Sequence, residues 1–488
     1  MRRALKIASV VVGVAAAALA TALFVLWSSA KTSNVGDLEF ANPLAIPPLA
    51  EARSDGDGRA TFELELQAGE TEILPGTKTE TWGANGPHLA PTLRASRGDE
   101  VMPVVSNGLD TETTTIHWHG MHLPAVADGG PHQTIAPGET WSPEWTIDQP
   151  AATLWYHPHP NEETEDQIYR GLVGMFIVDD PEADELALPD EYGADDIPLI
   201  IQDKKLDDDG SLDFSKGMVN PTGRLGDEIL INGTRDPHLE VRSERVRLRL
   251  LNASGARVYD IGFEDGREFD LIATDSGLLE EPVRMDRIQL SPAERVEIVA
   301  DFEPGDEVVL RSFEPDLGTN FWDGRFAGGD DSFDLLEIRA ADELEPAPGV
   351  PERLVSQDRP AAEPPAEVRT FRLSGQGSIN GRSMDMERID QVVSPGTTEV
   401  WEVENASGTP HNFHPHGVRF RVLEYTGEPP PPHLEGMKDT VFVPPNETVS
   451  LLIEFGDYTD SEHPYMYHCH ILQHEDRGMM AQFTVVER

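Results

Sequence analysis

One short pattern occurs three times in this chain of 488 residues: a turn, a strand in which apolar and polar side chains alternate, and an asparagine at the strand's end. The copies lie at residues 97–107, 243–252 and 395–405. Alternation with a period of two directs every second side chain to the same face, so each strand packs one face on a core. Three repeats of one β unit, separated by Gly- and Pro-rich turns, predict an all-β protein of three Greek-key sandwich or barrel domains.

Proline- and acid-rich stretches indicate where these units begin and end. We expect an export signal or membrane anchor at residues 1–30, a tether at 31–54, domains at 55–182, 190–340 and 368–488, and a Pro-rich linker at 341–367. The first and third domains close alike, on Tyr-His-Pro-His at 156–159 and Tyr-His-Cys-His at 467–470. The middle domain has no histidine in the corresponding segment at 258–262, so we expect it to be a spacer without a metal site.

The N-terminus has the pattern of a targeting segment. Basic residues at positions 2, 3 and 6 precede an apolar run from Ile7 to Trp27. A basic start followed by an apolar run is an export signal or a membrane anchor, and this run is long enough to span a bilayer. The Arg2-Arg3 pair partly resembles a twin-arginine signal, which serves proteins exported folded. We therefore expect a periplasmic, extracellular or cell-surface protein whose N-terminal segment is either removed or kept as an anchor.

The charge balance argues against one class of partner. The chain has 38 basic and 88 acidic residues, a formal net charge of −50. Nucleic-acid binding depends on Lys and Arg contacts to phosphates, so nucleic acid is not expected to bind. A solvated acidic surface keeps a protein soluble, and attraction of cationic substrates or metal ions is the alternative interpretation.

Histidines form the most informative chemical pattern. Ten of the 16 lie in four short clusters: His117 and His119; His157 and His159; His411, His414 and His416; and His468, His470 and His474. A single His-x-His pair on a strand is usually no more than two side chains on one face. Clusters in two related domains can instead surround a multinuclear metal site at a domain interface, and imidazole suits copper, zinc or iron.

The single cysteine, Cys469, favours copper among these metals, and its being alone excludes an intrachain disulfide. A thiolate, two imidazoles and a long axial thioether form the blue-copper electron-transfer site. The chain offers these ligands as Cys469, His411, His474 and Met479. Structural zinc sites usually use paired cysteines, which one Cys among many His fits poorly. Strand alternation directs Cys469 to one face and its two histidine neighbours to the other, so one strand joins two kinds of metal site.

With these motifs the sequence resembles the three-domain multicopper oxidases, which include laccases, bilirubin oxidases and a bacterial cuprous oxidase, over essentially all of the chain after residue 55. The resemblance implies three cupredoxin-like domains and four copper ions: one type 1, one type 2 and a type 3 pair. It implies type 1 ligands His411, Cys469, His474 and axial Met479, type 2 ligands His117 and His414, and type 3 ligands His119, His157, His159, His416, His468 and His470. Pro158 stands where Cys469 stands in the third domain, so no blue site is expected in the first domain.

Two carboxylates complete the expected site. Reduction of O2 to water consumes protons, so acids must reach the metal cluster. Asp128 lies eleven residues after His117, Glu475 directly follows His474, and both match positions that resemble proton donors of the family. The alternatives are a turn-forming Asp before two glycines and a solvated Glu.

The resemblance implies a small reducing substrate with O2 as the acceptor, and we expect the chain to act as a monomer. The cuprous-oxidase branch of the family that this sequence resembles carries an Asp and a Met just before the first type 1 histidine. This chain has Ser407 and Thr409 at those positions. Its twelve methionines are also scattered. We therefore expect laccase-like oxidation of phenols or aromatic amines. The alternatives are a cuprous oxidase, a non-enzymatic copper protein, and a metal-free cell-envelope protein of the same fold.

Overall fold

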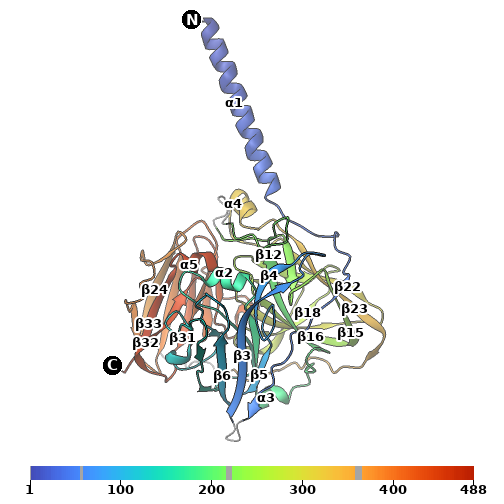
Figure 1. Ribbon diagram of the computed structural model, residues 1–488, viewed down its shortest axis with the longest axis vertical. Helices are drawn as coiled ribbons and strands as arrows, with labels where there is room; N and C mark the ends of the chain where they lie inside the picture. The colour runs from blue at the N-terminus through green and yellow to red at the C-terminus, as the bar shows by residue number, and fades with distance from the viewer. Residues whose placement is uncertain (1, 55–58, 216–221, 358–364, 488) are drawn as a thin grey trace.

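The computed structural model describes residues 2–54, 59–215, 222–357 and 365–487. Parts of the predicted linker at 341–367 and of the predicted domain at 55–182 therefore fall outside the described residues. Strands are the main regular structure of the described chain and helices are few. The strands form six sheets around three hydrophobic cores, which confirms the expected fold of three cupredoxin-like domains. Figure 1 shows these domains side by side, with one long helix projecting from them.

The first domain contains two sheets, with strand orders β2-β3-β6-β8 and β5-β11-β10-β7. Strands β4 and β9 pair with β3 and β6. The strands are β2 (Arg53–Ser54), β3 (Arg59–Thr71), β4 (Thr79–Ala84), β5 (Leu93–Ser96), β6 (Glu100–Asn107), β7 (His117–His119), β8 (Thr140–Trp141), β9 (Trp145–Thr146), β10 (Ala152–His157) and β11 (Gly174–Asp179). The short helices are η1 (Ala125–Ala127), α2 (Thr164–Tyr169) and α3 (Pro181–Asp184).

The second domain has sheets of order β1-β15-β23-β22-β17-β20 and β14-β13-β12-β16-β21-β18-β19. Its strands are β1 (Asn42–Pro43), β12 (Asp196–Lys204), β13 (Glu228–Ile231), β14 (Thr234–Arg235), β15 (Pro237–Ser243), β16 (Arg245–Asn252), β17 (Tyr259–Phe263), β18 (Phe269–Thr274), β19 (Gly277–Met285), β20 (Arg287–Leu290), β21 (Arg295–Asp301), β22 (Glu307–Phe313) and β23 (Phe333–Glu345). One short helix, α4 (Phe321–Phe326), interrupts the chain between β22 and β23.

The third domain has sheets of order β25-β24-β27-β31-β29 and β26-β33-β32-β28-β30. Its strands are β24 (Glu367–Ser374), β25 (Ser378–Ile379), β26 (Gln391–Val393), β27 (Thr398–Asn405), β28 (His411–Pro415), β29 (Phe420–Tyr425), β30 (Val441–Val443), β31 (Thr448–Glu454), β32 (Asp460–His468) and β33 (Met480–Val485). The helices are η2 (Pro432–Leu434) and α5 (Leu472–Asp476).

The repeated sequence pattern corresponds to β6, β16 and β27, and the structure explains its asparagine. Each of these strands pairs in parallel with another strand of its own domain. At their ends, the side-chain NH2 of Asn107, Asn252 and Asn405 donates to two backbone carbonyls, and the side-chain oxygen accepts the N–H two residues further on. All three side chains are buried, so each fixes the same turn without an unsatisfied polar group.

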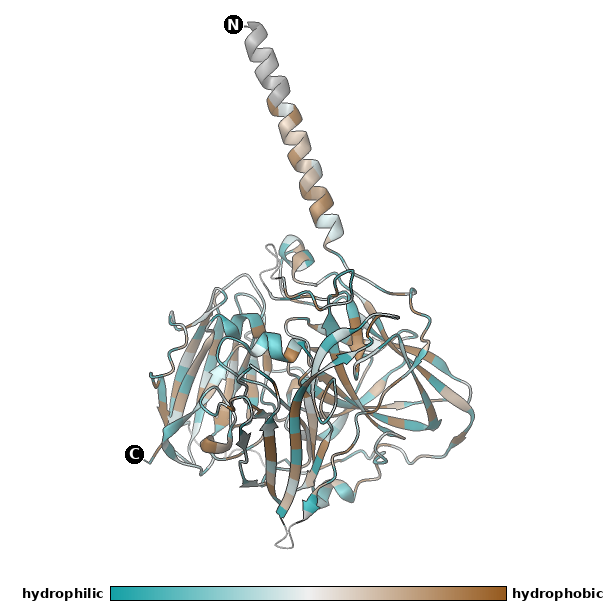
Figure 2. Ribbon diagram, viewed as in Figure 1, coloured by the Kyte–Doolittle hydropathy of each residue, from teal (hydrophilic) through white to brown (hydrophobic). Residues whose placement is uncertain are grey.

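The N-terminal helix α1 (Arg2–Ser29) stands away from the domains (Figure 1). Its span Val12–Ser29 is apolar (Figure 2) and long enough to cross a membrane, and its residues are exposed except Trp27, which is half-buried. The segment predicted as a tether, 31–54, lies against the first two domains. Asn42–Pro43 forms a parallel strand beside β15, and Leu49 pairs with Thr92 of the first domain.

Candidate metal centres

Eight imidazole rings from the first and third domains meet at the interface between these domains, and we call this group of rings the histidine seam. They come from the ends of β7, β10, β28 and β32 and from the residues just after these strands: His117, His119, His157, His159, His414, His416, His468 and His470. Each is at most 1% exposed. Rings of the two domains stack in pairs, with centroids 3.8 Å apart for His117 and His416 and 3.7 Å apart for His119 and His414. The structure therefore brings together histidines that are more than 250 residues apart in sequence.

Six of the eight rings form two triads of facing nitrogens. In one triad, His468 Nε2 lies 3.2 Å from His159 Nε2 and 3.1 Å from His416 Nε2. In the other, His157 Nε2 lies 3.5 Å from Nδ1 of His119 and 3.4 Å from Nε2 of His470. Two further nitrogens, Nε2 of His117 and of His414, are buried with no hydrogen-bond partner among the described residues.

Hydrogen bonds at the far side of the rings fix which nitrogen carries the lone pair. Nδ1 of His117 donates to the carbonyl of Asp128 (2.8 Å), and Nδ1 of His414 donates to the carbonyl of Asp439 (2.7 Å). A carbonyl only accepts, so the lone pair of each ring is on Nε2, the atom without a partner. Burial, with repulsion between neighbouring rings, lowers the pKa of His157 to about 3. Neutral imidazoles with converging lone pairs are what a soft cation such as copper requires.

Two aspartates hold the seam in equivalent ways. The backbone carbonyl of Asp128 accepts a hydrogen bond from His117, and its carboxylate accepts a second one from Nδ1 of His416 (2.8 Å). The backbone carbonyl of Asp439 accepts a hydrogen bond from His414, and its carboxylate accepts a second one from Nε2 of His119 (3.1 Å). Each aspartate thus orients one ring of its own domain and one ring of the other. The sequence analysis identified Asp128 but not Asp439, because the contact of Asp439 with His119 spans 320 residues.

The two aspartates differ in charge environment. Arg295 of the second domain donates to both oxygens of Asp439, at 2.7 and 2.6 Å, and both side chains are fully buried. No described Lys or Arg pairs with Asp128, and burial raises the pKa of that carboxyl well above its usual range. Burial also raises the pKa of Asp439, but the ion pair with Arg295 opposes this rise, so Asp128 is the carboxyl more easily protonated.

Glu475, on α5, is a third carboxylate that contacts the seam rings. Its carboxylate oxygens lie 3.1 Å from Nδ1 of His468 and 3.5 Å from Nδ1 of His159, and only 2% of the residue is exposed. It therefore contacts one ring from each domain, as the two aspartates do.

A second cluster lies inside the third domain. Sγ of Cys469 is 3.5 Å from Nδ1 of His411 and 3.7 Å from Nδ1 of His474, and these two nitrogens are 3.0 Å apart. Met479 is fully buried, and its carbonyl accepts the N–H of Cys469. Burial raises the pKa of the Cys469 thiol to about 12.

The two clusters are adjacent through one short segment. His468 and His470 contact the seam rings, while Cys469 between them points to His411 and His474. Asn412, which the sequence analysis did not single out, stabilises this arrangement. Its side-chain oxygen accepts the N–H of His470 (2.6 Å), and its NH2 donates to Pro292 of the second domain (2.9 Å).

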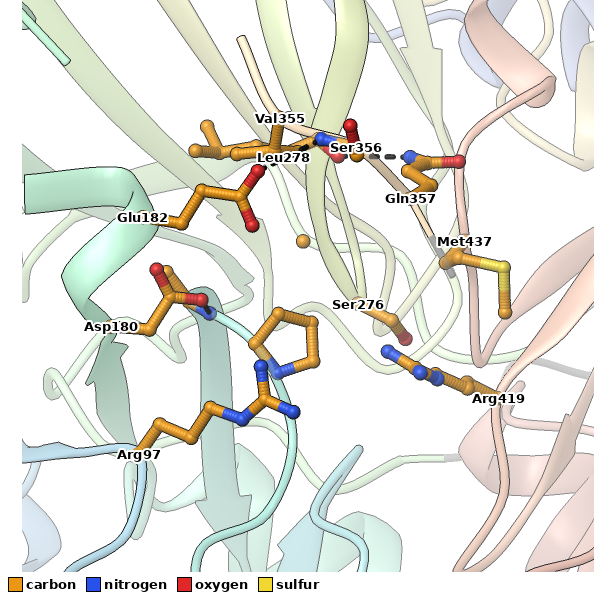
Figure 3. Close-up of a pocket in the computed structure, with 13 residues that line it drawn as sticks. Arg97, Asp180, Glu182, Ser276, Leu278, Val355, Ser356, Gln357, Arg419 and Met437 are labelled. Atoms are coloured by element: carbon orange, nitrogen blue, oxygen red, sulfur yellow. Dashed lines mark hydrogen bonds between the residues drawn. The ribbon is translucent and has the colours of Figure 1, made fainter. Parts of the chain in front are cut away.

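A cavity of about 200 Å³ lies where the three domains meet (Figure 3). Arg97 and Arg419 enter it from the first and third domains, and Ser276 lines it from the second. The hydroxyl of Ser276 donates to Asp439 (3.4 Å). One side chain therefore separates this cavity from an aspartate of the histidine seam.

Three cupredoxin-like domains, a histidine seam between the first and third, and a Cys–His cluster in the third are the features that define multicopper oxidases. The chain belongs to this family: models of multicopper oxidases match residues 65–183, 203–309 and 352–488. Its relatives include multicopper oxidase Mco of Staphylococcus haemolyticus, 35% identical over 91% of this chain and 92% of the relative. The cell division protein FtsP of Escherichia coli is 36% identical over the same shares of the two chains.

Solved structures show the same relationship. A laccase from Pediococcus acidilactici superposes with a TM-score of 0.83 at 36% identity, covering 91% of this chain and 94% of the laccase. A multicopper oxidase from Campylobacter jejuni, described as a metallo-oxidase, superposes with a TM-score of 0.80 at 29% identity, covering 93% and 97%.

Proposed function

We propose that this protein is a laccase-like oxidase with four copper ions, which oxidises phenols or aromatic amines and reduces O2 to water. The observation that carries the proposal is the complete set of converging, buried donor atoms at both clusters. When bound, copper supplies the one-electron oxidation of the donor and the four-electron reduction of O2.

The proposed ligands follow from the ring nitrogens that face one another. Cys469, His411 and His474 would hold the type 1 ion, with Met479 as the axial ligand. The two unpartnered nitrogens, of His117 and His414, would hold the type 2 ion. The two triads would hold the type 3 pair: His119, His157 and His470 in one, His159, His416 and His468 in the other.

The chain's own residues provide the electron and proton paths of this proposal. Because Cys469 is bonded through the backbone to His468 and His470, an electron received at the thiolate is a few covalent bonds from both triads. Asp128 would deliver protons, since burial raises the pKa of its carboxyl well above the usual range and no described Lys or Arg pairs with it. Burial raises the pKa of Glu475, but contact with His159 and His468 lowers it below its usual range, so this residue would act as a carboxylate that accepts protons and passes them on to the site.

Organic donors are favoured over cuprous ions by the residues beside the type 1 cluster. The hydroxyl of Ser407 lies 3.0 Å from Nε2 of His411 and 3.0 Å from the hydroxyl of Thr409. Cu(I) prefers thioether or thiolate ligands, which neither residue supplies. A metal-ion oxidase, as the Campylobacter relative is described, is therefore the less favoured reading.

A second candidate function follows from the FtsP relatives, which are described as cell division proteins. An envelope scaffold of this fold would not need metal. Copper content, the visible spectrum and O2 uptake of the copper-loaded protein separate the two. About four coppers per chain, a band at about 600 nm from Cu–thiolate bonding and O2 uptake with a dimethoxyphenol are expected. Protein that binds no copper would support the scaffold, and uptake with Cu(I) alone would support the metal oxidase.

A further inference from the structure

The last turn of α1 is not free but rests on α4 of the second domain. The guanidinium of Arg325 lies 3.9 Å from the ring centroid of Trp27, and the same Arg pairs with Asp330 at 3.1 Å. A cation over an indole face is a favourable contact, most of all when partly shielded from water. Figure 1 shows α4 beside the base of α1. The fold therefore has a binding place for the end of its own N-terminal helix.

The chain that follows the helix is fastened at once. Lys31 pairs with Glu314 (2.7 Å), and the N–H of Thr32 donates to Asp331 (2.8 Å). Asn34 then exchanges two hydrogen bonds with the backbone of Asp334, at 3.2 and 2.7 Å. The chain directly after the helix is therefore attached to the second domain without a flexible linker. As a result, the orientation of α1 in its surroundings determines the orientation of the three domains.

The surface around this point exposes aromatic side chains. Phe321 is 77% exposed, more than any other large apolar side chain in residues 12–53, 59–215, 222–357 and 365–487, and Trp322 beside it is 37% exposed. The side chain of Asn320 caps α4 by accepting the N–H groups of Trp322 and Asp323, which holds the two aromatic residues at the first turn. Aromatic residues next to an apolar membrane-length helix are typical of the membrane–water interface.

We propose that α1 is retained as a membrane anchor and that α4 lies on the same lipid bilayer, with Phe321 and Trp322 in its headgroup region beside Trp27. The partner is the bilayer in which α1 is inserted. The contact is apolar rather than electrostatic: the chain carries a net charge of −50, and the Arg of α4 is already engaged with Trp27 and Asp330. Zwitterionic lipid is therefore sufficient.

If α1 were a signal that is removed, the contact between Arg325 and Trp27 would be absent from the mature protein and would serve no structural purpose. Retention and docking also explain together why the most exposed phenylalanine lies next to the helix base rather than elsewhere. The inference is independent of the redox chemistry proposed above.

The test uses the full copper-loaded chain in phosphatidylcholine nanodiscs. Because the only native cysteine is buried, Phe321→Cys provides a single accessible thiol for an environment-sensitive fluorophore. Val368→Cys, on the exposed side of β24 in the third domain (55% exposed), is the matched control. A circular dichroism spectrum and a melting temperature equal to those of the unmodified protein show that each variant is folded.

We expect lipids with a quencher near the headgroup to reduce the emission of the label at position 321 at least twofold and to leave that at 368 unchanged. Equal response of both labels to a water-soluble quencher, with none to the lipid quencher, would overturn the docking. The mass of the protein isolated from the membranes of the cells that make it tests retention. A mature chain that lacks Trp27 would refute the anchor.

Discussion

The first and third domains build their histidine pairs in the same way, yet only one of them has a thiol cluster. In the first, β10 pairs with β7 so that His157 lies opposite His117; in the third, β32 pairs with β28 so that His468 lies opposite His414. The residue after the strand is Pro158 in one case and Cys469 in the other. The shared register shows that the seam belongs to the repeated scaffold, whereas the thiol cluster is an addition to one copy.

The rest of the first domain confirms that more than one residue distinguishes the copies. Thr114 precedes His117 by three residues, as His411 precedes His414. The hydroxyl of Thr114 donates to Gln167 on α2 (2.6 Å). At the position where the third domain has His411, the first domain therefore has a hydroxyl engaged in a neutral hydrogen bond.

The largest expected effect comes from removing the distinguishing residue. Cys469→Ser should abolish the band at about 600 nm, which needs Cu–thiolate bonding, and reduce oxidase turnover to background. The seam histidines are untouched, so the other coppers and the type 2 electron paramagnetic resonance signal should remain. Retention of the blue band in this variant would disprove the role given to Cys469.

Asp128 and Asp439 test whether the two halves of the seam are equivalent. Asp128→Asn should lower turnover about a hundredfold, the scale of lost acid catalysis, with little change in melting temperature. Asp439→Asn removes the two-point partner of buried Arg295 and leaves only Asp275, which is 3.8 Å away and also pairs with Lys438, so it should cost about 3–5 kcal/mol of unfolding free energy.

Steady-state kinetics across pH and denaturant unfolding of both variants make the comparison. Asp439→Glu, which keeps the charge, is the control for the ion pair and should recover part of the stability. Equal losses of turnover and stability in the two Asn variants would mean that Arg295 creates no difference between the aspartates.

Copper loading of the thiol cluster should depend on pH. The metal-free thiol has a pKa of about 12, so binding must release its proton at any lower pH. Thiolate concentration rises tenfold per pH unit in this range, so the apparent affinity should rise about tenfold per unit from this group alone. Titration followed by the blue absorbance at two pH values measures it, and a pH-independent affinity would contradict the protonated thiol.

The smallest effect is expected from making the first domain more like the third. Pro158→Cys supplies a thiol, but Thr114 and Gln167 provide no imidazole there. Blue absorbance per chain should therefore stay unchanged, with copper content as the control for an intact seam. A doubled absorbance would show that the middle residue alone decides where a blue site forms.

The sequence was sufficient for the fold class and family, both confirmed, because alternation and His-x-His spacing are local properties of single strands. The domain boundaries and the assignment of ligands to individual coppers remain predictions. Asp439 and Arg295 could not be found in this way, since their ion pair joins two domains and spans 144 residues. The contact of Trp27 with Arg325 was missed for the same reason. What the local pattern does not encode is which strand ends become neighbours after the domains assemble.

The histidine seam also has a consequence for the chain as a polymer. His159 and His468 are separated by 309 residues, while their Nε2 atoms lie 3.2 Å apart. A metal held by both closes a ring of chain that contains the whole second domain. Loop-closure entropy grows only with the logarithm of loop length, about 0.6 kcal/mol for each doubling, so even so large a ring is inexpensive to close. A metal bound there would cross-link the first and last domains, which could separate only when these histidines release it. The middle domain, which holds none of the seam histidines, lies within the ring of chain that this cross-link closes.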